Sequence, residues 1–194
     1  ARPLWYDLTN STNGVAFWPM TQKYRHIVAG NHGGLVCNHR LFYVTPKELT
    51  GKEASVLVGV LNSTFVAMLK HFYGRYAGAE GTLDTEVIDC LLIEVPDPRG
   101  APDSLAARFG RAMDSLCRRE VTHLVEDELL DCHTSERLRT LLTRTVAMPK
   151  ELRQADRQEL DDCVLELIGV ADPQERIRIR EELYAQTVGY YRYQ

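Results

Sequence analysis

The chain has 194 residues, of which 44% are hydrophobic and 26% are charged, and its formal net charge is −4. This composition is ordinary for a folded globular chain and excludes disordered, collagen-like and low-complexity proteins. No apolar run approaches the roughly eighteen residues of a membrane span, and no signal peptide opens the sequence. Because the first residue is Ala1 rather than Met, we expect a fragment of a longer protein.

The first hundred residues carry short strand-like segments separated by glycine, proline and asparagine turn signals. We predict strands over residues 5–8, 15–18, 26–28, 35–37 and 41–44. Residues 87–95 are apolar and β-branched enough to form a further, buried strand.

A long helix is predicted over residues 53–76, because apolar side chains recur there at three- and four-residue spacing. That spacing gives one broad face made of Val56, Leu57, Val60, Leu61, Phe65, Met68, Leu69 and Phe72. Strands around one core helix predict an α+β fold, with a small mixed sheet packed on the long helix.

The composition changes near residue 100, where three prolines fall within residues 96–102. Such a run cannot continue a helix or a central strand. Ten of the thirteen glycines precede this boundary, and the remainder is rich in Leu, Arg and Glu. We therefore predict an α+β domain over residues 1–100 and a helical domain over residues 101–194.

The second part shows helix boundary signals, and we predict a small helical bundle. The helix starts are expected at Asp103, Thr134, Asp156 and Asp172. Asp156 forms a capping-box pattern with Glu159, and Gly169 is expected as a C-terminal cap. The inward residues would be Leu105, Phe109, Met113 and Leu116, then Leu138, Leu141, Leu142 and Val146, then Leu160, Val164, Leu167 and Ile168, and finally Ile179, Leu183 and Val188.

The charge is unevenly distributed, with a balance of +4 over residues 1–82 and −8 over residues 83–194. A basic face can bind a polyanion on an acidic chain, because exposed charges more than about 8 Å apart are largely screened from each other. The five cysteines form no C-x-x-C pair, so we predict no metal site. Reduced thiols are typical of a cytoplasmic protein.

The motifs of several enzyme classes are absent, among them the nucleophile elbow, the P-loop, the zinc-protease helix and the dinucleotide-binding turn. The acid pairs Asp161–Asp162 and Glu181–Glu182 lie opposite apolar positions, so we predict a solvated face for each. Asp84, Glu86 and Asp89 leave a metal-dependent nuclease open as an alternative.

Two basic and aromatic clusters are the stronger functional signal. One cluster is Lys23, Tyr24, Arg25 and His26, and the other is Lys70, Arg75 and Tyr76 at the end of the long helix. Lysine and arginine bind phosphate, arginine also reads guanine, and aromatic rings stack on unpaired bases. The alternative is that Phe72 and Tyr73 belong to the core and the cations only favour a helix C-terminus.

Three runs resemble the specificity region of N6-adenine DNA methyltransferases, a family that includes type II and type IIG restriction–modification enzymes. They are Val60-Leu61-Asn62-Ser63-Thr64, Tyr73-Gly74-Arg75 and Val95-Pro96-Asp97-Pro98. Residues 2–8 and 23–26 are similar to the same region, and residues 159–162, 167–169 and 172–173 are similar to its helical end. The resemblance covers residues 1–99 well and the remainder more weakly.

The resemblance implies a DNA-binding target-recognition module whose partners are double-stranded DNA and an upstream methyltransferase domain of the same parent chain. The family's catalytic (Asn/Asp)-Pro-Pro-(Tyr/Phe) motif and its S-adenosylmethionine motif are absent. No residue therefore inherits a catalytic role, and the cofactor is expected only in the intact enzyme. The residues expected to contact DNA are Lys23, Tyr24, Arg25, His26, Lys70, Arg75, Tyr76, Thr82 and Glu86.

A function of another class stays open beside DNA recognition. The acidic, amphipathic helices of the second part are also typical of a protein-interaction or structural module within a larger multidomain protein. Salt separates the two, because DNA binding weakens steeply as salt rises while apolar docking hardly changes.

Overall fold

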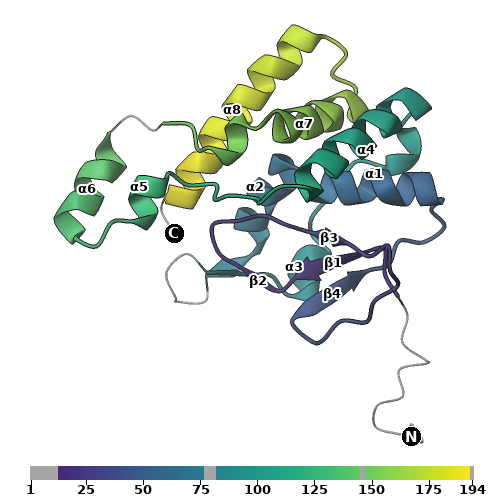
Figure 1. Cartoon of the computed structure of the whole chain (residues 1–194), viewed down its shortest axis with the longest axis horizontal. Helices are drawn as coiled ribbons and strands as arrows, with labels where there is room; N and C mark the ends of the chain where they lie inside the picture. The colour runs from purple at the N-terminus through teal and green to yellow at the C-terminus, as the bar shows by residue number, and fades with distance from the viewer. Residues whose placement is uncertain (1–12, 77–81, 145–146, 193–194) are drawn as a thin grey trace, which may run out of the picture.

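The computed structural model describes residues 13–76, 82–144 and 147–192, and Figure 1 shows their arrangement. The α+β fold class is confirmed, with short strands in the N-terminal half and packed helices after them. In Figure 1 the helices α1, α4, α7 and α8 lie above the strands. The strand predicted over residues 5–8 and the family-like run at residues 2–8 lie outside the described residues.

The strands form two separate antiparallel sheets rather than one mixed sheet. The first sheet has the order β3-β1-β4, made of Ala29–Gly30, Ala16–Pro19 and Leu41–Val44. The second has the order β2-β6-β5, made of Thr21–Gln22, Leu83–Asp84 and Arg75–Tyr76. Strands β1 and β4 confirm the predictions over residues 15–18 and 41–44. Only one residue separates β1 from β2, so the chain passes directly from the first sheet into the second.

The strands predicted over residues 26–28 and 35–37 do not form. An N–H group in each segment donates to an asparagine side chain instead of to a neighbouring strand. The Val28 N–H donates to Asn62 Oδ1 (2.9 Å), and the Leu35 N–H donates to Asn31 Oδ1 (2.8 Å). Side-chain acceptors compete with strand ladders in this way.

The helix predicted over residues 53–76 is wrong at one point, where the chain bends by 64° between α1 (Gly51–Leu61) and α2 (Thr64–Tyr73). Ser63 is the N-cap of α2, and its hydroxyl accepts a hydrogen bond from the Val66 N–H. Apolar residues recur at helical spacing on both sides of Ser63, so the spacing predicts one continuous helix and does not reveal the cap. No single helix among the described residues is long and apolar enough to cross a membrane; α1 and α2 meet that criterion only together, across the bend.

Residues 87–95 form a short helix and an irregular segment rather than the predicted buried strand. Helix α3 (Val87–Cys90) begins with a capping box in which Glu86 and Asp89 exchange hydrogen bonds. The Asp89 carboxylate accepts from the Glu86 N–H (2.9 Å), and an acid that bonds back to the N-cap in this way favours a helical start over a strand. The segment is also largely exposed, and Leu91 has 79% of its surface open to solvent.

The second half consists of helices and short 3-10 turns. Their bounds are Pro98–Gly100 (η1), Asp103–Cys117 (α4), Asp127–Leu130 (α5), Ser135–Thr143 (α6), Glu151–Arg153 (η2), Ala155–Leu167 (α7) and Pro173–Arg192 (α8). Three predicted boundary residues are confirmed. Thr134 caps α6, Gly169 follows α7 with a φ of 96°, and the Asp172 carboxylate accepts from the first turn of α8.

Two predicted caps are wrong. Helix α7 begins after Gln154, and the Asp156 carboxylate accepts hydrogen bonds from the side chain of Arg119 rather than acting as the cap. Helix α4 begins after Pro102, with Asp103 inside its first turn. Leu138 and Ile168, which the sequence predicts inside, lie at the surface; Val146 is outside the described residues.

The hydrophobic core crosses residue 100. One cluster joins Trp18 and Val60 from the first half with Phe109 and Leu160 from the second. Helix α1 packs on α4, and α2 packs on α8. The division into domains at residue 100 stays a prediction, and the packing shows that the second half supports the helices of the first.

Candidate nucleic-acid interface

The second sheet aligns three polar side chains across its strands. Thr21 is in register with Asp84, and Asp84 is in register with Arg75. Directly opposed residues on antiparallel strands point to the same face. We call these three residues the polar row. Thr21 and Arg75 are exposed and Asp84 is half-buried, so the row presents a hydroxyl, a carboxylate and a guanidinium side by side.

Hydrogen bonds hold the members of the polar row in place. Thr21 Oγ1 donates to Asp84 Oδ1 (2.5 Å). Arg75 Nη2 donates to Asp89 Oδ1 (2.9 Å), and its Nη1 lies 3.4 Å from Glu86 Oε2. The Arg75 side chain still keeps 56% of its surface exposed. A guanidinium that is already oriented loses less side-chain entropy when it binds a ligand.

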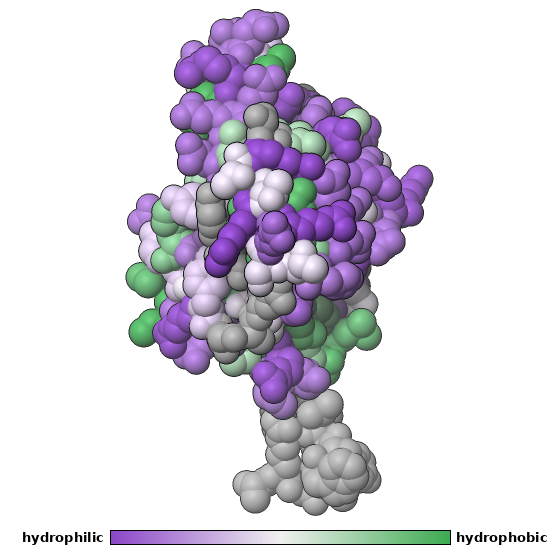
Figure 2. All heavy atoms as spheres, turned by 90° about the vertical axis from the view of Figure 1, so that its left-hand side faces the viewer, coloured by the Kyte–Doolittle hydropathy of each residue, from purple (hydrophilic) through white to green (hydrophobic). Residues whose placement is uncertain are grey.

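The remaining predicted residues of this region lie around the same hairpin. Tyr76 and Glu86 are exposed, and Thr82 is half-buried. The Tyr76 hydroxyl lies 3.0 Å from His71 Nδ1. The loop between β5 and β6, residues 77–81, lies outside the described residues. In Figure 1 this hairpin lies at the left-hand side, and Figure 2 shows that this side of the molecule is largely hydrophilic.

Thr21 and Asp84 join the candidate interface in the structure, although neither is among the DNA contacts that the sequence predicts. The two residues are 63 positions apart and meet only through the pairing of β2 with β6. No local spacing reports that register. The sequence alone suggests Asp84 only as a metal ligand.

Lys70 is buried, in contrast to the expectation that it contacts phosphate. Only 1% of its surface is exposed, and its ammonium donates to Gln22 and lies 5.2 Å from the centre of the Trp18 ring. Burial lowers the pKa of Lys70 to about 7. Because Gln22 follows Thr21 on β2, Lys70 ties the second sheet to α2 instead of facing a ligand.

The first basic cluster does not form one surface. Lys23 is exposed, and half-buried Arg25 pairs with Glu120 (3.1 Å). His26 is buried, and its Nε2 lies 2.7 Å from a backbone carbonyl oxygen of α1. Burial, with the charge of Lys70 nearby, holds the pKa of His26 well below its usual value. Tyr24 packs against the apolar cluster of α8.

The nuclease alternative has no geometric support. Asp84 accepts from Thr21, while Glu86 and Asp89 share the guanidinium of Arg75. Within residues 13–76, 82–144 and 147–192, no three His, Cys, Asp or Glu side chains come close enough together to hold a metal ion. All five cysteines are free thiols.

The solvated face predicted for Asp161–Asp162 is wrong. Asp161 is fully buried, and its carboxylate accepts from the Thr64 N–H (2.7 Å), the Thr64 hydroxyl (2.6 Å) and the Tyr184 hydroxyl (2.8 Å). Asp162 is held in ion pairs between α4 and α8. The Glu181–Glu182 pair is exposed as predicted. Asp161 therefore anchors the start of α2, the helix that leads into the hairpin.

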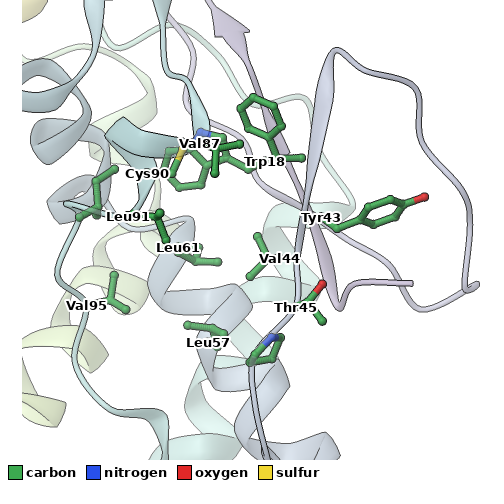
Figure 3. A pocket seen from close by; sticks show the side chains of 13 residues that line it. Trp18, Tyr43, Val44, Thr45, Leu57, Leu61, Val87, Cys90, Leu91 and Val95 are labelled. Atoms are coloured by element: carbon green, nitrogen blue, oxygen red, sulfur yellow. The ribbon is translucent and has the colours of Figure 1, made fainter. Parts of the chain in front are cut away.

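An apolar pocket of about 430 Å³ lies between β4, α1 and residues 87–95. Figure 3 shows Trp18, Leu57, Leu61 and Cys90 around it. At the rim of the pocket, α3 and the segment after it expose four large apolar side chains, which we call the apolar patch: Val87, Ile88, Leu91 and Leu92. Val87 and Leu91 also line the pocket. The patch has little charge and differs in chemistry from the polar row.

The buried ammonium of Lys70 predicts a pH-dependent stability. In the unfolded chain Lys70 regains a pKa near 10.5, so between about pH 7 and pH 10 the unfolded chain binds more protons than the folded chain. The contribution of Lys70 to the free energy of unfolding therefore rises with pH, by up to about 1.4 kcal/mol per unit. Lys70→Met removes the cost of burying the ammonium, so it should have a higher free energy of unfolding than the wild type at pH 7. This difference in free energy of unfolding should shrink steadily from pH 7 to pH 9.

Chemical denaturation at several pH values measures this difference. Lys52→Met is the matched control. Lys52 is exposed, and its hydrogen bond to Asp103 raises its pKa, so its effect should stay constant over the same range. A pH-independent difference for Lys70→Met would show that the folded protein keeps the ammonium fully charged.

Comparison of the chain with protein families, with curated proteins and with solved structures finds no match. The functional argument therefore rests on the geometry of the site, on the chemistry of its side chains and on the resemblance of the sequence runs given above.

Proposed function

We propose that the chain is the DNA-recognition module of an N6-adenine DNA methyltransferase or restriction–modification enzyme, with methyl transfer carried out by another part of the parent chain. The observation that supports this proposal is the polar row. A hydroxyl, a carboxylate and a guanidinium stand in register on a narrow, three-stranded sheet. The choice of this enzyme family rests on the resemblance of the runs around Asn62, Gly74 and Pro96 to its specificity region.

The β5–β6 hairpin of the second sheet suits the major groove of DNA. Neighbouring strands lie about 4.8 Å apart, and the major groove, about 12 Å wide, accepts an α-helix or a two-stranded β-ribbon. Arg75 and Asp84 would reach base edges from this ribbon, with Thr21 on β2 at the rim of the groove. The strands are only two residues long, so the hairpin can enter the groove without a long flat edge.

Each member of the polar row has a matching group on a base edge. Arg75 would donate two hydrogen bonds to guanine O6 and N7, Asp84 would accept from the cytosine amino group, and Thr21 would pair with either kind of group. Lys23, exposed just after β2, would contact phosphate. Because carboxylates flank Arg75, we expect weak non-specific binding and a stronger dependence on DNA sequence.

Selection from a pool of randomised DNA duplexes tests the proposal. The wild-type chain should enrich a short motif that contains a guanine. Arg75→Ala should lose the preference at one position of that motif, with binding of the enriched duplex weakened by about 5- to 150-fold, the value of one bidentate contact. Arg75→Lys should restore the preference only in part, because an ammonium lacks the planar fork of two parallel donors.

Arg178→Ala is the matched control, since Arg178 is an exposed arginine that pairs with Glu175 near the start of α8, away from the end of that helix that contacts α2. It should leave the motif and the affinity unchanged. Failure of the wild-type chain to enrich any motif would contradict the proposal, and so would an unchanged motif in Arg75→Ala.

A second candidate function is docking of a protein partner, and the apolar patch favours it. Four large exposed apolar side chains within six residues are more than the scattered apolar residues expected on a monomer's surface. The acidic helices of the second part are the surface that the sequence suggests for such docking, and the apolar patch on α3 would be a second candidate surface. Binding that persists unchanged at high salt would favour docking over DNA recognition.

A further inference from the structure

One side of strand β4 has no strand paired with it among the described residues, because β4 lies at the edge of the first sheet. Hydrogen-bonded and non-hydrogen-bonded pairs alternate along an antiparallel ladder. The Met20 N–H donates to the Arg40 carbonyl oxygen (3.0 Å). Two residues further along, Trp18 and Phe42 form the next hydrogen-bonded pair. The backbone N–H and C=O of Tyr43 therefore point away from β1, toward the open edge.

The apolar pocket between β4, α1 and residues 87–95 runs along this open edge. Five residues in succession, 42–46, line it, although successive side chains of a strand point to opposite faces. The pocket therefore reaches past the side of the strand. Figure 3 shows the Tyr43 ring turned away from the pocket, with Val44 on one wall and Val95 on the opposite side. None of the lining residues is charged.

An occupant of this place needs an extended backbone and apolar side chains. Open strand edges take up another extended segment through main-chain hydrogen bonds, and a pocket beside the edge accepts its alternate side chains. Phe42 and Val44 pack against the core but stay only half-buried. The four side chains of the apolar patch are open to solvent at the rim. An added strand with apolar residues on one side would cover both groups.

Residues 4–8 of the same chain, which lie outside the described residues, have the sequence that this place requires. The sequence predicts a strand over residues 5–8. In an extended segment Leu4, Tyr6 and Leu8 fall on one side, and Trp5 and Asp7 fall on the other. The first side matches an uncharged, apolar pocket, and the Asp7 carboxylate would face solvent.

Residue 13, the first described residue, lies next to the open end of β4. The Val15 N–H donates to the Val44 carbonyl oxygen (2.8 Å), and a Cβ on Gly14 would lie 2.6 Å from the same oxygen. From Leu8 to Asn13 the chain can span up to about 17 Å. A strand on the outer side of β4 would lie about 10 Å from β1, at two strand spacings. Residues 9–12 are therefore long enough to bring residues 4–8 to the open edge.

We propose that residues 4–8 dock in the pocket as a further strand on the open edge of β4, with Leu4, Tyr6 and Leu8 turned inward. The segment would run in the same direction as β4, because it leads to the Val44 end of that strand. Its docking would make the pocket part of the core and would fix the point at which the chain before residue 13 leaves the first sheet. This inference does not depend on DNA binding.

Disulfide trapping tests the docking, because Cys90 lines the pocket as a free thiol. Tyr6→Cys, at the middle of the inward side, should form an intramolecular disulfide with Cys90, since that bond requires Cα atoms within about 7 Å. Oxidised glutathione is the oxidant, at alkaline pH because burial raises the pKa of the Cys90 thiol. The background removes the exposed and half-buried cysteines elsewhere in the chain: Cys37→Ser, Cys117→Ser and Cys132→Ser. Peptide mass spectrometry at timed intervals measures the rate.

Asp7→Cys is the matched control, because its side chain would face the other way, and it should react at least about ten times more slowly. Leu8→Asp combined with Tyr6→Cys would bury a carboxylate among apolar side chains, so its disulfide should form as slowly as that of Asp7→Cys. Trp5→Asp combined with Tyr6→Cys puts the same charge on the outer side and should keep the fast rate.

Equal rates for Tyr6→Cys and Asp7→Cys would overturn the inference, and so would disulfides that join two chains, since a second copy would then occupy the pocket. A fast rate that survives Leu8→Asp would also overturn it, because the segment would then be near the pocket without docking in it. The polar row lies on the other sheet, so the proposed function would stand in each of these cases.

Discussion

Asp161→Ala is expected to lower the free energy of unfolding by about 3–5 kcal/mol, because three buried donors would lose their acceptor. These donors are the N–H and hydroxyl groups of Thr64 and the hydroxyl of Tyr184. Burial raises the pKa of Asp161, against the opposing charge of Arg157 and the bonds from Thr64. Equilibrium unfolding in urea, followed by circular dichroism, measures the loss.

Two further variants make this result specific. Asp161→Asn keeps an acceptor for Thr64 and gains an amide that can donate to a hydroxyl, so its loss should be smaller, about 1–2 kcal/mol. Glu181→Ala, an exposed acid on α8, should change stability by less than about 0.5 kcal/mol. If Asp161→Ala also changed the free energy of unfolding by less than about 0.5 kcal/mol, the buried carboxylate would not be the group that joins α7 to α2.

Glu151→Ala is expected to cost about 3–5 kcal/mol, because it would leave a buried arginine without its counter-ion. The Glu151 carboxylate accepts from Arg157 Nη2 (3.0 Å), Arg119 Nη1 (2.8 Å) and the Thr122 N–H (2.9 Å). Arg157 is 1% exposed, so water cannot replace the lost partner. Unfolding in urea again provides the measurement.

The effect of Glu151→Ala should also depend on pH. Burial acts to raise the pKa of Glu151, but hydrogen bonds from Arg119 and the charge of Arg157 outweigh it and hold that pKa below its usual 4.5. The stability that the carboxylate provides is therefore complete above pH 4.5 and is lost as the pH falls through the folded-state pKa. The difference between variant and wild type should shrink in acid.

Glu128→Ala is the control for a surface pair, because Glu128 and Arg144 form an ion pair in which both side chains are about half exposed. Its cost should not exceed about 1 kcal/mol. An equal cost for the two variants would show that burial does not decide the strength of these pairs.

These buried acids explain what the second half contributes to the candidate interface. Asp161 and Arg157 both lie on α7. Asp161 accepts from Thr64, the first residue of α2, and Arg157 donates to the carbonyl oxygen of Asn62 just before α2. Helix α2 then leads through Gly74 into the hairpin that carries Arg75. The helical half therefore positions the polar row from the far end of α2, without contributing a side chain to it.

The family-like run around Asn62 has a structural explanation. The Asn62 side chain accepts from the Val28 N–H (2.9 Å) and donates to the Val28 and Val58 carbonyl oxygens (2.7 and 2.9 Å), while Ser63 caps α2. Both residues build the bend between α1 and α2. The sequence contained this cap, but the uninterrupted apolar spacing favoured one continuous helix.

The sequence by itself determined the features that depend on neighbours within a few positions. The caps at Thr134 and Asp172 and the end of α7 at Gly169 were predicted correctly, because each depends on residues of its own helical turn. The α+β class followed from the apolar spacing and from the placement of turns, which are also local.

Only the tertiary structure decided which polar side chains are buried and which share a surface. Lys70 and Asp161 resemble solvated residues in their own helices, but they are buried by elements that lie tens of positions away. Thr21 joins Asp84 and Arg75 only through strand register. Burial and register depend on long-range packing, and the spacing of residues along one segment carries no record of the partner that packs against it.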